Sequence, residues 1–175
     1  MKKEIVITSA NIGEHKLSIL FRSVYEDLKR LKELDINLYL STWSGGRNEF
    51  DGKCTVCLGG AACLGFVQKE DVTDAVIQQI SDVMYFGSRK LDGITFTAKE
   101  RDNVRSMMKM FDNFRNANYY SMIEHYNNLA TEKNHIKDDN IIPPYKFKTF
   151  SGYEDIKVVQ KEVLRCAIFL EKKGY

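Results

Sequence analysis

The residues best suited to chemistry lie in one short apolar segment, residues 54–65, downstream of the single tryptophan, Trp43. The segment holds three of the four cysteines, Cys54, Cys57 and Cys63, together with three glycines and two alanines. Cysteine thiolates bind zinc and act as nucleophiles or redox centres. A helix of small residues also lets a neighbouring element approach its backbone, and free cysteine then serves as a small hydrophobic residue. The segment therefore predicts either a reactive site or close packing.

The spacing of the cysteines favours close packing. A zinc site needs about four ligands, and Cys54 and Cys57 supply one pair to which Cys63 adds a third ligand. No second pair of cysteines or closely spaced histidines follows along the chain. On a helix, Cys57 and Ala61 would share one face against a neighbouring element. We therefore predict a packed helix over about 53–67 and keep Cys54, Cys57 and Cys63 as the alternative metal or redox site.

A second candidate site combines basic, amide and aromatic side chains: Arg101, Arg105, Lys109, Asn113, Tyr119 and Tyr120. Arg101 and Arg105 lie one turn apart near a predicted helix start, where backbone donors and guanidinium groups hold phosphate or carboxylate. Asparagine side chains hydrogen-bond base edges and ribose, and tyrosine rings stack on bases. The set predicts a nucleotide pocket, and the alternative is a solvated helix face around a helix break.

Other candidates for catalysis carry less weight. His125 stands beside Glu124 and titrates near neutrality, as a general base must. No nucleophile, oxyanion loop or paired carboxylate can be assigned to it, so a structural or surface role is favoured. Residues 9–16 lie between a predicted strand and a predicted helix, but they lack the glycine and lysine spacing of a phosphate-binding loop. The sequence thus favours a protein without catalytic activity or cofactor.

The length and composition limit the class of protein to which the chain can belong. The 175 residues suit one compact domain, and 43% hydrophobic with 29% charged residues is ordinary for a globular chain. A net charge of +2 is too small for a protein that coats nucleic acid. No apolar run is long enough to span a membrane, and the N-terminal residues lack a signal-peptide pattern. We therefore expect a cytoplasmic protein with reduced cysteines.

Hydrophobic periodicity predicts a mainly α (α+β) fold, a single domain over 1–175 with about five helices and one or two short strands. The expected helices cover about 15–34, 53–67, 71–83, 98–129 with a break near Asn116, and a final helix that ends at 172–174. Residues 5–7 are expected to be a short strand or an extended lead-in, and 38–43 a strand or a buried extended segment. Residues 131–150 are expected to be an irregular or extended excursion. Thr97–Glu100 and Ser151–Glu154 both match the capping box that opens a helix.

Three separated segments carry a resemblance to a known group. Trp43 followed by Cys-Thr-Val-Cys-Leu-Gly-Gly-Ala at 54–61, the segment Met110–Arg115, and the closing segment Phe169–Tyr175 resemble small phage and bacterial proteins with a Trp…Cys-x-Val-Cys-Leu-x-Gly-Ala motif. These segments are separate pieces between Trp43 and Tyr175, and Cys63 is additional to the pattern. The resemblance implies a phage origin and an anti-defence role, and it implies no catalytic activity.

Three functional hypotheses follow. The first is a phage accessory protein that binds and sequesters a small nucleotide-like ligand, such as a host immune signalling nucleotide, without transforming it. The second is a protein that docks onto a host factor and inhibits it, which predicts an exposed apolar patch. The third is a cysteine- or zinc-dependent enzyme. The first is favoured, and a homo-oligomer is compatible with it.

Overall fold

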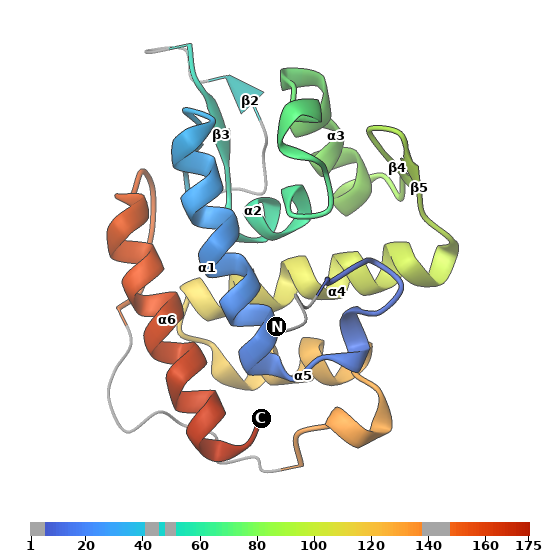
Figure 1. Ribbon diagram of the computed structural model, residues 1–175, viewed down its shortest axis with the longest axis vertical. Helices are drawn as coiled ribbons and strands as arrows, with labels where there is room; N and C mark the ends of the chain where they lie inside the picture. Colours follow the sequence, from blue (N-terminus) through green and yellow to red (C-terminus); the bar gives the residue numbers. More distant parts are fainter. Residues whose placement is uncertain (1–5, 41–45, 48–51, 138–147) are drawn as a thin grey trace, which may run out of the picture.

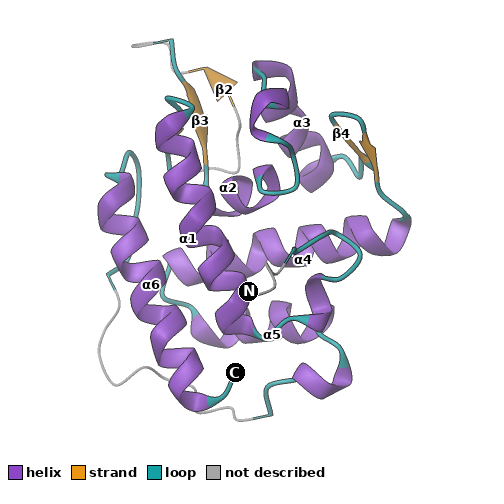
Figure 2. Cartoon of the chain, in the orientation of Figure 1, coloured by secondary structure: helices purple, strands orange, loops and turns teal. Residues whose placement is uncertain are grey.

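The computed structural model describes residues 6–40, 46–47, 52–137 and 148–175, and helices dominate this part of the chain (Figures 1 and 2). The α-helices are α1 (Leu17–Glu33), α2 (Leu58–Leu64), α3 (Asp74–Tyr85), α4 (Ala98–Arg115), α5 (Tyr119–Leu129) and α6 (Ile156–Lys173). Short 3-10 helices occur at η1 (Ile12–Glu14), η2 (Lys69–Asp71) and η3 (Glu132–Asn134). The mainly α expectation is confirmed.

The strands are few and short. They are β1 (Asn37–Leu38), β2 (Gly46–Arg47), β3 (Cys54–Val56), β4 (Lys90–Leu91) and β5 (Ile94–Thr95). In the first sheet β3 is central, with β1 parallel on one side and β2 antiparallel on the other. The strands β4 and β5 form an antiparallel hairpin that the hydrophobic pattern did not predict.

The helices form one compact domain around α2. Helix α1 lies along α6, and α4 lies along α5, as Figure 1 shows. Helix α2 packs against α1, α3 and α4. Phe21 of α1 joins the two pairs of helices, because its ring makes a tilted contact with Phe111 and an edge-to-face contact with Phe114 of α4, at centroid distances of 5.1 and 4.9 Å. None of the helices in the described residues has the length and apolar character that crossing a bilayer requires.

The cysteine segment is the largest departure from the expected elements. Instead of one helix over 53–67, it forms strand β3 followed by helix α2. Cys57 separates the two elements in an extended conformation, and its sulfur accepts a hydrogen bond from the Gly60 amide at 3.2 Å. Residues 54–56 pair with strands on both sides, so tertiary hydrogen bonds outweigh the local helical pattern.

Two predicted helix starts are displaced by a few residues. Helix α3 begins after Thr73, whose hydroxyl accepts the Val76 amide hydrogen bond at 3.3 Å, and not at Asp71. Helix α6 begins after Asp155 and not after the Ser151–Glu154 box. Gly152 there has φ of +75°, and Tyr153 forms an isolated bridge to Tyr39, so this segment stays extended.

The other boundaries agree more closely with expectation. The Thr97–Glu100 capping box is present in full, and Gly174 ends α6 in the left-handed conformation. The helix break near Asn116 is confirmed. Val6 and Ile7 are not in a strand, and Ile5 lies outside the described residues. Of the expected strand 38–43, Leu38 belongs to β1, Tyr39 forms an isolated bridge, and residues 41–43 lie outside the described residues. Residues 138–147 of the expected excursion also lie outside them.

A close backbone approach fixes the N-terminal segment onto the end of α5. A Cβ atom at Gly13 would lie 1.9 Å from the Leu129 carbonyl oxygen, so only glycine fits. The Gly13 carbonyl also accepts hydrogen bonds from the Thr131 amide at 2.8 Å and from the Asn134 side chain at 3.2 Å. Gly13 therefore has a structural role in residues 9–16, because it allows this segment to pack against the end of α5.

Gly13→Ala is expected to lower the free energy of unfolding by about 2 kcal/mol or more, because backbone must move to admit the methyl group. Urea unfolding followed by circular dichroism measures the loss. Gly93→Ala is the matched control, because no atom lies within 4 Å of the position that its methyl group would take. Equal stability of the two variants would contradict the close approach.

A half-buried carboxyl group lies beneath the end of α2. Asp27 of α1 borders a small cavity of about 20 Å³ together with Gly65 and Met107. A Cβ atom at Gly65 would lie 2.8 Å from both Asp27 carboxyl oxygens. Burial raises the pKa of Asp27 from 3.8 to about 8, and the charge of Arg30 opposes the shift. The folded protein therefore favours the neutral acid.

This raised pKa predicts that stability falls as the pH rises from about 4 to 8, because the unfolded carboxyl loses its proton first. Asp27→Asn removes the effect, and it should stabilise the protein by roughly 3 kcal/mol more at pH 8 than at pH 5. Urea unfolding at both pH values tests this. Asp82→Asn, an exposed change on α3, is the control. A variant whose advantage is the same at both pH values would contradict the shift.

Candidate functional site

A tight helical hairpin builds the candidate site. Helices α4 and α5 are joined by only three residues, of which Ala117 has a positive φ of 55°. The Asn118 side chain accepts a hydrogen bond from the Ser121 amide at 3.2 Å and so caps α5. The two helices consequently pack along each other, with polar side chains on the outer side of their contact.

These polar side chains line an open hollow of about 240 Å³ between α4 and α5. The lining residues are Asp102, Arg105, Ser106 and Lys109 from α4, and His125 and Asn128 from α5. On α4 the other three residues follow Asp102 by three, four and seven positions, and on α5 Asn128 follows His125 by three. Such spacing places each set on one face of its helix. The hollow thus gathers cationic and hydrogen-bonding groups from two elements.

The charged side chains in and beside the hollow differ in how far they are paired. Arg101 binds Asp102 through two nitrogens, at 3.1 and 2.8 Å, and also donates to the Gly87 carbonyl at 3.2 Å. Hydrogen bonding to Arg101 lowers the pKa of Asp102, which keeps its charge and its pairing. The Arg105 Nε atom is buried and has no hydrogen-bond partner among the described residues. Arg105 and Lys109 therefore keep positive charge available for an anion.

His125 contributes a titratable ring opposite these cations. It is half-buried, and burial holds its pKa below the ordinary 6.5. The charge of Lys109 lowers the pKa further, and Glu124 opposes the shift. The imidazole is therefore neutral at pH 7, with one nitrogen as a donor and the other as an acceptor.

The structure brings together two of the six residues predicted for the nucleotide pocket, Arg105 and Lys109. Arg101 lies beside the hollow but is held by Asp102 and Gly87. The Asn113 side chain turns back along α4 to donate to the Lys109 carbonyl at 2.9 Å.

The two tyrosines of that prediction lie elsewhere. Tyr119 packs against the hydrophobic core, and Tyr120 is 75% exposed without lining the hollow. The hollow therefore contains two of the predicted cationic side chains, Arg105 and Lys109, and neither of the predicted stacking tyrosines.

Sequence reasoning missed Ser106 and Asn128 and assigned His125 no part in the site. A signal for them existed. Once the break near Asn116 is recognised as a hairpin, the polar positions of α4 that share a face with Arg105 must lie near polar positions of α5. Ser106 follows from spacing on α4, and His125 and Asn128 follow from their spacing on α5.

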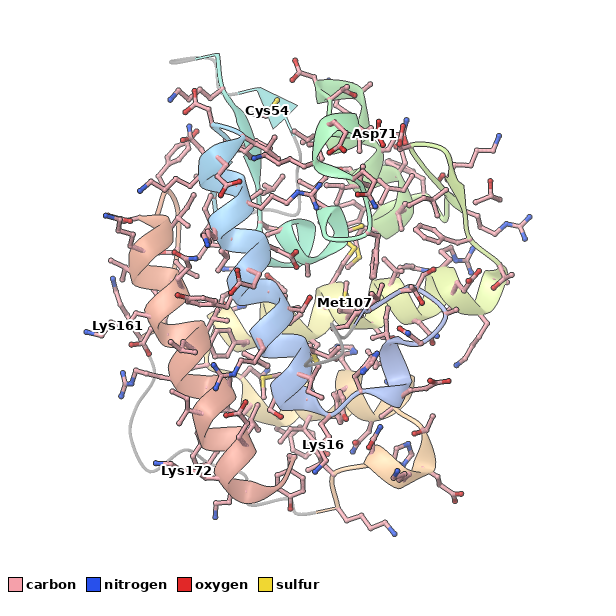
Figure 3. All side chains as sticks on the ribbon, in the orientation of Figure 1. Lys16, Cys54, Asp71, Met107, Lys161 and Lys172 are labelled. Carbon is pink, nitrogen blue, oxygen red and sulfur yellow. The ribbon has the colours of Figure 1, made fainter. Side chains whose placement is uncertain are left out.

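The cysteines form a different environment. Cys54, Cys57 and Cys63 are all buried, and they lie on β3, at the cap of α2 and within α2. The Cys54 thiol donates to the Asp74 carboxylate at 3.0 Å, at the sheet end of the molecule in Figure 3. Among the described residues, no group of three or more histidine, cysteine, aspartate or glutamate side chains is placed to hold a metal ion.

Burial raises the pKa of Cys57 to about 11 and that of Cys63 to about 12. A thiolate is the reactive and metal-binding form, so burial suppresses both kinds of chemistry. The geometry supports the packing interpretation of the segment and lends no support to the alternative site at Cys54, Cys57 and Cys63.

Comparison with known proteins does not assign a family. No family model matches the chain, and no curated protein or solved structure matches it significantly. The candidate site must therefore be judged on its own chemistry.

The buried thiols yield a direct test. Cys57, Cys63 and Cys166, which are 2%, 0% and 1% exposed, should react with Ellman's reagent at least about a hundredfold more slowly in the native protein than in urea. Cys54 is 8% exposed and should react first. A Cys54→Ser variant identifies its contribution. A thiol as fast as free cysteine, or one equivalent of zinc in the purified protein, would contradict the packing interpretation.

Proposed function

We propose that the protein binds a small phosphate-bearing ligand, of the nucleotide class, at the hollow between α4 and α5 and does not transform it. The observation that carries this proposal is that two cationic side chains, Arg105 and Lys109, line the same hollow, and that the buried Nε atom of Arg105 has no hydrogen-bond partner among the described residues. Guanidinium and ammonium groups that line one hollow can both donate hydrogen bonds to a single anion.

The composition of the hollow supports an anion as the bound group. Guanidinium matches the geometry of phosphate oxygens, and an ammonium group adds a mobile point charge. Ser106 and Asn128 supply neutral hydrogen-bonding groups at the same place. Asp102 adds negative charge, but Arg101 is bound to it at 2.8 Å and offsets that charge.

The residues that line the hollow indicate which part of the ligand is recognised. Among the described residues, no aromatic ring other than the His125 imidazole lines the hollow, because Tyr119 and Tyr120 lie elsewhere. Recognition therefore runs through phosphate oxygens and not through stacking on a tyrosine. Within the proposal, the biological role is that of a phage accessory protein that sequesters a host immune signalling nucleotide, which requires tight binding and no turnover.

One observation favours the second hypothesis, docking onto a host protein. At the end of α3 the aromatic side chains of Tyr85 and Phe86 are 54% and 81% exposed. Exposed aromatic rings are common anchors in protein interfaces. Substitution of Phe86 by serine would weaken a protein complex and leave nucleotide binding unchanged, which separates the two functions.

The binding proposal is tested by exposing the purified protein to a nucleotide extract of bacterial cells, washing it, and releasing bound material by heat for mass spectrometry. A defined panel of nucleoside phosphates and cyclic dinucleotides then gives dissociation constants by calorimetry. Retention of one nucleotide per site is expected. The double variant Arg105→Glu, Lys109→Glu should bind at least about tenfold more weakly, because two attractive charges become repulsive.

Lys161→Glu is the matched control, an exposed charge reversal on α6 away from α4 (Figure 3). It should bind like the wild type, and circular dichroism should show that both variants are folded at the temperature of the binding measurement. A double variant that binds with unchanged affinity would overturn the site, and a protein that retains no nucleotide from extract or panel would overturn the proposed function.

A further inference from the structure

We propose that His125 is a proton-dependent third donor of the anion site, so that the hollow holds anions more tightly as the pH falls. This inference rests on the proposed function, since it concerns the regulation of the same site. The geometry brings His125 of α5 into the same hollow as Arg105 and Lys109 of α4. One side of the hollow therefore carries permanent charge, and the other carries charge only when its ring is protonated.

The surroundings of His125 disfavour protonation of the ring in the free protein, because they lower its pKa. The charged groups that act on it are Lys109 from α4 and Glu124 from its own helix. Arg105 and Asp102 share the hollow with it, and η1, which also packs on α5, carries the exposed Glu14. Partial burial and the neighbouring ammonium group both oppose a second positive charge, and Glu124 only partly offsets them.

A bound anion reverses this balance. Its negative charge compensates Lys109 and attracts the imidazolium, and protonation turns the acceptor nitrogen into a second donor. The pKa of His125 must then be higher in the complex than in the free protein. Linkage requires the affinity for an anion of constant charge to rise as the pH falls from the higher pKa to the lower one, tenfold for each unit between them.

The probes must not titrate themselves. Sulfate and a dinucleotide phosphodiester keep their charge between pH 5.5 and 7.5, so any change in affinity belongs to the protein. Proton NMR of the imidazole Cε1 hydrogens follows the three histidines with and without each probe. The expected result is a rise of about one unit in the pKa of His125 on binding, and affinity about tenfold higher at pH 5.5 than at pH 7.5.

Two variants assign the effect. His125→Gln should bind with an affinity that no longer depends on pH, while His135→Gln, an exposed change after η3, should behave like the wild type. The NMR titration of the wild type needs no variant and so remains decisive if His125→Gln fails to fold.

The outcomes separate the two proposals. Binding with the same affinity at both pH values, or with an unchanged pKa of His125, would overturn this inference and leave the proposed function standing. A wild-type protein that binds neither these probes nor any nucleotide at either pH would overturn both.

Discussion

The rest of the structure depends on the complete burial of α2. All of its seven residues are buried, although an isolated helix of this length is unstable in water. The Cys57 sulfur accepts the Gly60 amide hydrogen bond in its first turn, and Arg30 donates to its last carbonyl, that of Leu64, at 3.1 Å and also to the carbonyl of Val67 in the turn that follows. Small side chains let α1, α3 and α4 close around this helix. Tertiary packing therefore stabilises α2, and α2 in turn sets the spacing of its neighbours.

This packing determines which face of α4 is free to bind. One side of α4 is committed to α2 and to the ring of Phe21, which contacts Phe111 and Phe114. Because a helix is rigid, fixing these apolar residues also fixes the direction of Arg105 and Lys109. They then lie along the contact with α5, where His125 completes the hollow. The site is thus a consequence of how the core is packed.

Much of the fold could be predicted because the signals are local. The apolar period of α1, the Thr97 capping box and the glycine after α6 act within a few residues of the backbone they control. Strand β3 could not be predicted, since Cys54–Val56 is extended only through partners distant in the sequence. The start of α6 at Asp155 likewise depends on the bridge between Tyr39 and Tyr153.

In the candidate site, too, only the features with a local signal could be predicted from the sequence. A cluster of basic residues in sequence identified Arg105 and Lys109, but it could not show that Arg101 is already bound by Asp102 and Gly87. That ion pair has a further consequence for the site. An unpaired Asp102 would attract Arg105 and repel an anion, whereas its pairing with Arg101 weakens both interactions. In the proposed site, Arg101 would therefore favour anion binding through its carboxylate partner, without lining the hollow itself.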